Sequence, residues 1–139
     1  MAAIVVVAHQ NLGRELVRAA LHIVGHGVPD LDHVDISPEW PYEEARERVR
    51  AALDRVGSGE GVILATDMYG GTPANLALDF LDPGHVEVVA GLNLPMLVRL
   101  LTYRSRPLEE QVQKGLEGGR EGVLLGGCQP LSGAPQERP

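Results

Sequence analysis

Apolar residues follow two alternating patterns along the chain. Short apolar runs predict strands, and the first of them, residues 3–8, has no polar alternation, as expected of a strand buried on both faces. Between these runs, apolar residues recur every three or four positions, which is typical of amphipathic helices. The predicted strands cover residues 3–8, 33–36, 61–66 and 86–90, and the predicted helices begin near residues 12, 42, 73, 96 and 107. The alternation predicts an α/β domain with a mainly parallel four-stranded sheet and helices on both faces.

The C-terminal part of the pattern is less regular. Gly118 and Gly119 predict the end of the last helix and a hinge, and the apolar run 123–125 predicts one more strand. We expect this strand to cover either the open edge of the strand at 86–90 or the same edge of a second subunit. Beyond it, Pro and Gly accumulate without periodicity, as in a flexible segment or the stump of a linker. The predicted division is a domain of residues 1–126 and a flexible tail of residues 127–139.

Composition narrows the classes of protein. The 139 residues carry a net charge of −7 with no basic cluster, which argues against a nucleic-acid surface. No apolar run reaches the length of a membrane span and the N-terminus lacks a signal-peptide pattern, so we expect a cytoplasmic protein without membrane insertion. Cys128 is the only cysteine, which excludes an intrachain disulfide and a Cys-rich zinc site. His22 and His26 lie four residues apart, but their motif has no carboxylate, and we expect no metal there.

Three polar residues follow predicted strands: His9, Asp67 and Asn93. The carboxyl ends of parallel strands meet at one edge of the sheet, where ligands bind in open α/β folds. After Asp67, two glycines allow a tight turn and the close approach of a ligand, and Thr72 is expected to cap a helix ahead of Pro73. A helix N-terminus reached through a glycine-rich loop suits an anion, phosphate above all. Each of these residues also has a purely structural interpretation, as a cap, a loop carboxylate or a turn former.

Four segments together match a known family in their order and spacing. They read IVVVAH (4–9), ATDMYGGTPAN (65–75), GLNLPML (91–97) and GREGV (119–123). Through them the chain resembles the IIA proteins and domains of the mannose family of the bacterial phosphoenolpyruvate:sugar phosphotransferase system. The combination is much more specific than any one of the segments.

The resemblance implies both a function and a site. His9 is then the phosphorylated histidine, which accepts a phosphoryl group from the histidine-containing phosphocarrier protein and passes it to a IIB protein. Asp67 falls on the aspartate that orients this histidine, and Thr72 falls on the hydroxyl residue that contacts the phosphate. The resemblance also implies a homodimer in which the last strand is exchanged between subunits and runs antiparallel to the others.

The residues themselves allow this chemistry. A neutral imidazole attacks a phosphoryl group through its unprotonated nitrogen, and a carboxylate bound to the other nitrogen fixes that tautomer. We therefore expect Asp67 to hold the ring of His9. The backbone amides of Gly71, Thr72 and Ala74, with the Thr72 hydroxyl, are expected to stabilise the phosphoryl oxygens. The sequence has no Walker-type lysine or acidic magnesium cluster, so we expect no nucleotide cofactor.

Two other classes of function stay open. One is a regulatory protein that signals through its phosphorylation state and moves no sugar. Gene neighbourhood separates that class from a transport component, because transport requires IIB and membrane components. The other class is a small-molecule or metal-binding domain that uses His9 and Asp67 as ligands, which metal analysis of the purified protein would decide.

Three large side chains near the predicted edge have two interpretations each. Met68 and Tyr69 are expected on the rim where a partner docks, unless Tyr69 packs on the first helix. Trp40 either lines the crevice or covers the core.

Overall fold

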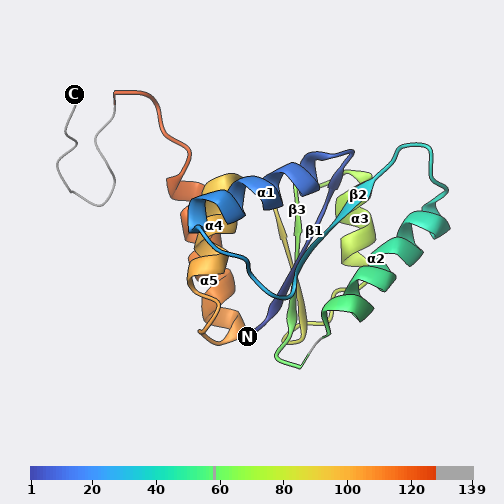
Figure 1. The fold of residues 1–139 in the computed structure, drawn as a ribbon. Helices are drawn as coiled ribbons and strands as arrows, with labels where there is room; N and C mark the ends of the chain where they lie inside the picture. Colours follow the sequence, from blue (N-terminus) through green and yellow to red (C-terminus); the bar gives the residue numbers. More distant parts are fainter. Residues whose placement is uncertain (58, 128–139) are drawn as a thin grey trace.

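The computed structural model describes residues 1–57 and 59–127 of the chain. In chain order the elements are β1 (Ala3–His9), α1 (Leu12–Val24), β2 (Leu31–Ile36), α2 (Tyr42–Val56), β3 (Val62–Thr66), α3 (Thr72–Leu78), β4 (Val86–Ala90), α4 (Leu94–Thr102) and α5 (Leu108–Glu121), as Figure 1 shows. The order of strands and helices confirms the predicted α/β class, and α2 begins at the predicted residue. Of the predicted flexible tail, residues 128–139 lie outside the described residues.

The four strands form one parallel sheet in the order β2-β1-β3-β4. The central strands β1 and β3 pair in a register that places Val7 opposite Thr66. The residues that follow these two positions therefore emerge side by side at the carboxyl edge of the sheet. This register is what brings His9, at the end of β1, next to Asp67, the first residue after β3.

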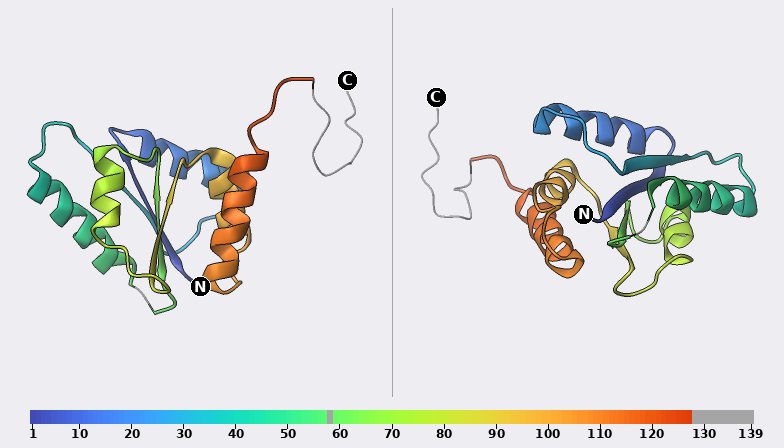
Figure 2. Two further views of the ribbon diagram at one scale, coloured as in Figure 1. Left: turned by 180° about the vertical axis from the view of Figure 1, so that it is seen from behind. Right: turned by 60° about the horizontal axis from the view of Figure 1, so that its bottom comes forward.

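Helices cover both faces of the sheet, as the two views of Figure 2 show. Along β1, Ile4 and Val6 pack on the side of α1, α4 and α5, whereas Val5 and Val7 pack on the side of α2 and α3. All four side chains are fully buried, which is why the strand shows no polar alternation in the sequence. Among the helices of the described residues, none has the length and apolar character needed to cross a bilayer.

The predicted hinge at Gly118 and Gly119 is wrong, because both residues lie inside α5 and are buried. A Cβ atom on Gly118 would come within 2.8 Å of the Arg99 Cβ, and one on Gly119 within 2.7 Å of the Met96 Cε. The missing side chains allow α5 to pack closely against α4. Glycine inside a helix costs about 1 kcal/mol per residue relative to alanine, but the packing of α5 on α4 outweighs this cost here.

The predicted last strand is not formed in the single chain. Residues 123–125 have no regular secondary structure, and the side chains of Val123, Leu124 and Leu125 are exposed. Figure 1 shows this segment leading away from the body of the domain beyond α5. A strand exists only when another strand edge supplies its hydrogen-bond partners, and this segment meets none within the described chain.

The close packing of α4 and α5 predicts the effect of adding one methyl group. In Gly115→Ala, the new Cβ would lie 2.3 Å from the Leu100 Cδ2, and Leu100 is fully buried. Overpacking costs about 1–3 kcal/mol, whereas the helix propensity of Ala returns about 1 kcal/mol. We expect a net loss of up to about 2 kcal/mol in the free energy of unfolding, measured by chemical denaturation.

The matched control is Gly27→Ala, because a Cβ at residue 27 meets no atom within 4 Å. This variant should be unchanged or slightly more stable, by less than about 1 kcal/mol. A Gly115→Ala variant that is more stable than the wild type would contradict the close helix contact.

Candidate functional site

His9 and Asp67 form a hydrogen-bonded pair at the carboxyl edge of the sheet. The Asp67 Oδ2 lies 2.8 Å from the His9 Nδ1 and also accepts a hydrogen bond from the His9 backbone amide at 3.1 Å. The structure thus brings together the two strand-end residues that the sequence singled out. The second contact means that the carboxylate fixes the backbone of β1 as well as the imidazole ring.

The Asp67 carboxylate is held in place and mostly buried, whereas the His9 imidazole is partly exposed. Asp67 Oδ1 accepts a hydrogen bond from the Met68 amide at 3.1 Å, and its side chain is only 10% exposed. The side chain of His9 is 45% exposed. Partial burial by itself raises the pKa of Asp67, but the hydrogen bonds from the side chain and backbone of His9 outweigh it and hold the pKa below its usual value. Asp67 is therefore a carboxylate at neutral pH.

The position of Asp67 determines which ring nitrogen of His9 is free. Because the carboxylate accepts at Nδ1, we assign the proton of the neutral ring to Nδ1 and the lone pair to Nε2. A Cβ atom on Gly71 would lie 2.9 Å from the His9 Cε1 and 3.2 Å from Nε2. The free nitrogen thus faces the backbone of the glycine-rich loop, and any side chain at residue 71 would displace the ring.

The loop after Asp67 leads into α3 one residue earlier than predicted. Gly71, with an extended backbone, is the N-cap, whereas Thr72 is the first helical residue and makes no capping hydrogen bond. Gly71 fits the N-cap because a larger residue would collide with His9. The first helical bond runs from the Asn75 amide to the Gly71 carbonyl, and Pro73 has no amide hydrogen. The geometry of a helix start leaves the amides of Thr72 and Ala74 without helical partners, close to His9.

Asn93 caps a helix and joins two helices, and these structural contacts use its side chain. Its side-chain oxygen accepts a hydrogen bond from the Met96 amide at 2.9 Å and so caps α4. Its side-chain nitrogen donates to the Gly119 carbonyl at 3.0 Å and so ties α4 to α5. Both ends of the amide are therefore used, one within α4 and one between α4 and α5, and Asn93 has a structural role.

A cavity of about 280 Å³ opens beside His9 and is lined by two aromatic residues. The sequence left the position of one of them, Trp40, undecided and did not indicate the other, Tyr42, as a site residue. Trp40 lines this cavity and also packs on the core between the sheet and α2, so both of its interpretations hold. Tyr42 lines the cavity and donates a hydrogen bond to Asp79 at 2.6 Å. This hydrogen bond, together with partial burial, raises the pKa of Tyr42 to about 12. No local pattern pairs residues 42 and 79, because they meet only when α2 and α3 share one face of the sheet.

The rim around His9 is exposed. Tyr69 is 74% exposed and Met68 is 56% exposed, so the alternative in which Tyr69 packs on α1 is wrong. Across residues 1–57 and 59–127, no three His, Cys, Asp or Glu side chains gather in a group that could hold a metal ion. His22 and His26 are both exposed at the far end of α1.

The fold and the site define an open parallel α/β domain with a carboxylate-paired histidine at the carboxyl edge of its sheet. The sequence model of the family described as "PTS system fructose IIA component" matches residues 3–116, where PTS stands for phosphotransferase system. The chain belongs to this family, and with it to the phosphoryl-carrying transferases of the phosphotransferase system.

Individual relatives agree with this family. The chain is 33% identical over 135 residues to the "PTS system mannose-specific EIIAB component" of Escherichia coli K12, an alignment that covers 95% of the chain. The alignment covers 42% of that relative, so the chain spans less than half the length of the curated proteins it matches.

Solved structures show the same fold. The "mannose/sorbose specific IIA subunit" of Enterococcus faecalis superimposes with a TM-score of 0.79 at 22% identity, over 89% of this chain and 93% of that one. The PTS IIA protein associated with the fucose utilization operon of Streptococcus pneumoniae gives a TM-score of 0.68 at 29% identity, over 84% of this chain and 93% of that one.

Proposed function

We propose that the chain is a phosphohistidine carrier that accepts a phosphoryl group on His9. The observation that carries this proposal is the pairing of His9 Nδ1 with Asp67 at 2.8 Å, which leaves Nε2 as an exposed nucleophile beside the glycine-rich loop. Family membership supports the phosphotransferase class, and the geometry supports the choice of residue.

In the proposed step, the lone pair of His9 Nε2 attacks the phosphorus of the donor's phosphohistidine. The new Nε2–P bond forms while the donor N–P bond breaks, and the donor imidazole keeps the released electron pair. The ring of His9 retains its Nδ1 proton, and the positive charge that develops on the ring is stabilised by the carboxylate of Asp67. No other proton has to move.

The phosphoryl oxygens need donors that are already in place. We assign this role to the backbone amides of Gly71, Thr72 and Ala74 and to the Thr72 hydroxyl. Two features support the assignment. The loop at Gly71 lies so near the side of the His9 ring that carries Nε2 that a Cβ there would collide with it, and the first turn of α3 has amides without helical partners. The fixed amides need no reorganisation during transfer.

The proposed donor is the histidine-containing phosphocarrier protein and the proposed acceptor is a IIB protein of a sugar uptake system, both acting in the cytoplasm. Exposed Met68 and Tyr69 beside the site offer an apolar rim for these partners. A chain that takes up phosphate but passes none to any IIB protein would instead be a regulatory phospho-acceptor.

The first functional prediction concerns the site of phosphorylation. After incubation with phosphoenolpyruvate, enzyme I and the phosphocarrier protein, intact mass should show one added phosphoryl group that is lost in acid, as expected for phosphohistidine. His9→Gln should take up none. The other four histidines are matched controls, and their Gln variants should label like the wild type: His22, His26, His33 and His85. Acid-stable label, or label on His9→Gln, would rule out the proposed site.

The second functional prediction concerns Asp67. Asp67→Asn keeps the shape of the side chain but removes the charged acceptor, and charge-assisted hydrogen bonds contribute about 1.5–3 kcal/mol. Phosphoryl transfer to His9, measured by rapid quench, should slow by about one to two orders of magnitude. The matched control is Asp35→Asn, which alters the other His–Asp pair of the chain, with His33 at 3.2 Å. Equal rates in the two variants would remove the proposed role of Asp67.

We also propose a homodimer in which residues 123–125 add to the sheet edge of a second subunit. Three exposed apolar side chains in a row are unusual on a monomer, and β4 is an edge strand of the sheet. The α5 helix ends at the carboxyl edge, where Gly122 lies against Pro95. We propose that the exchanged strand runs antiparallel to β4 of the second subunit.

The dimer proposal predicts a charge-sensitive assembly. Leu124→Asp places a carboxylate in the exchanged segment, so the wild-type dimer should become a monomer in light scattering at micromolar concentration. Ile23→Asp is the matched control, because Ile23 is 53% exposed and Leu124 is 55% exposed, but Ile23 lies on α1. A monomeric wild type would rule the exchange out.

A further inference from the structure

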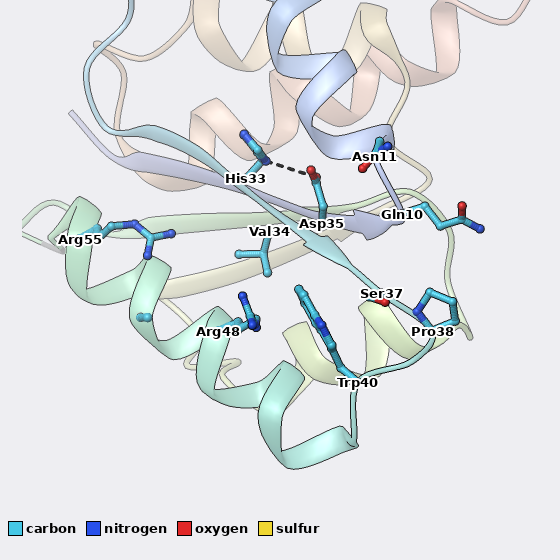
Figure 3. Close-up of a pocket in the computed structure, with 11 residues that line it drawn as sticks. Gln10, Asn11, His33, Val34, Asp35, Ser37, Pro38, Trp40, Arg48 and Arg55 are labelled. Atoms are coloured by element: carbon cyan, nitrogen blue, oxygen red, sulfur yellow. Dashed lines mark hydrogen bonds and ion pairs between the residues drawn. The ribbon is translucent and has the colours of Figure 1, made fainter.

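A second polar pocket lies along the outer edge of β2, next to the His9 site but not part of it. It has a volume of about 660 Å³ and is bounded by β2 on one side and α2 on the other. It shares Gln10, Ser37, Pro38 and Trp40 with the cavity beside His9, so these residues form a common wall. We call this pocket the β2-edge groove, and Figure 3 shows its lining side chains.

One part of the groove is cationic. Arg48 and Arg55 reach into it from the same side of α2, seven residues and hence about 10 Å apart along the helix axis. The guanidinium of Arg48 lies 4.0 Å above the centre of the Trp40 ring, and that of Arg55 is held at 3.0 Å by Asp32. Arg48 is also paired with Glu44 at 3.3 Å, and Arg55 uses its Nε and one terminal nitrogen on Asp32. Neither carboxylate lines the groove, so each arginine is positioned from behind and keeps further N–H donors for a ligand.

His33 lies on the other face of β2 from the two arginines. It points toward α1 together with Asp35, which accepts a hydrogen bond from the Arg14 amide, whereas Val34 points toward α2. The His33 Nδ1 lies 3.2 Å from the Asp35 Oδ1. The His33 backbone amide, on the edge strand, is already bonded to the Asp32 side chain at 2.7 Å. The edge of β2 is therefore partly blocked against another strand, and the groove suits a compact molecule better than an extended peptide.

At its other end the groove is lined by three neutral polar side chains, Gln10, Asn11 and Ser37, and by the Asp35 carboxylate (Figure 3). Asn11 occupies the N-cap position of α1, yet its side chain makes no capping hydrogen bond. The Arg14 amide in the first turn of that helix is bonded instead to Asp35, at 3.1 Å. The helix therefore does not need the Asn11 amide, which is left at the groove for another partner.

We propose that the β2-edge groove binds a phosphorylated sugar. The arginines bind the phosphate, because guanidinium groups form strong, paired hydrogen bonds with phosphate oxygens. The amide and hydroxyl groups of Gln10, Asn11 and Ser37 bind the hydroxyls of the ring, and the volume lies within the range of small-molecule sites. The choice of a sugar phosphate as ligand rests on the proposed function, because such a molecule is the product of sugar uptake by phosphoryl transfer.

The test uses Trp40, the only tryptophan in the chain, as a built-in fluorescent reporter. Glucose 6-phosphate is the probe, and glucose and inorganic phosphate are its two halves. We expect a saturable change of Trp40 emission with glucose 6-phosphate, and binding of either half at least about tenfold weaker.

Two arginine variants locate the site. Arg55→Ala removes a groove donor that does not touch Trp40 and should weaken binding about tenfold or more. Arg50→Ala is the matched control on the same helix, because Arg50 lies over Phe80 and outside the groove, and its affinity should equal that of the wild type. At the other end of the groove, Asn11→Ala should weaken binding of glucose 6-phosphate but not of inorganic phosphate.

Several results would overturn the proposal. They are the absence of any response to glucose 6-phosphate, equal affinity for inorganic phosphate, and equal losses in Arg50→Ala and Arg55→Ala. Labelling of His9 is measured in the same preparation. If His9 labels normally while glucose 6-phosphate does not bind, the groove proposal fails and the carrier function stands.

Discussion

The parallel register between β1 and β3 is the constraint on which the site depends. Because Val7 lies opposite Thr66, the next residues of both strands emerge at one edge, and Asp67 reaches the ring and the backbone of His9 together. A shift of this register by one residue would turn the side chains of one of the two strands to the opposite faces of the sheet. The contact between histidine and carboxylate is thus maintained by the hydrophobic core as a whole.

The two partners differ in exposure, and the difference suits phosphoryl transfer. The carboxylate is nearly buried and held by backbone amides, so its position and charge are fixed before any partner arrives. The imidazole is partly exposed, and its Nε2 lies next to Gly71, where a side chain would collide with the ring. Most of the effect expected from such a site is positioning, because phosphoryl transfer requires little other chemistry from the protein.

Contacts between helices elsewhere in the domain stabilise the fold without involving His9 itself. On one side of the sheet, α5 packs on α4 through buried glycines, and Asn93 joins the two helices away from His9. On the other side, Tyr42 and Asp79 tie α2 to the end of α3, near the cavity beside His9. The wall that contains Trp40 belongs both to that cavity and to the β2-edge groove, so a ligand in the groove would contact the surroundings of His9.

The sequence by itself determined the order of strands and helices, since an uninterrupted apolar strand and a three-to-four-residue helical repeat each reflect burial that the local chain must satisfy. It also determined which residues end the strands, and therefore that His9 and Asp67 share an edge. Only the tertiary structure decided the role of Gly118, which lets α5 pack closely on α4 where local propensity predicts a hinge. It likewise decided that Asn93 joins helices and that residues 42 and 79 meet. These outcomes depend on which element packs against each residue. A local sequence pattern does not show contacts between residues that are far apart in the chain.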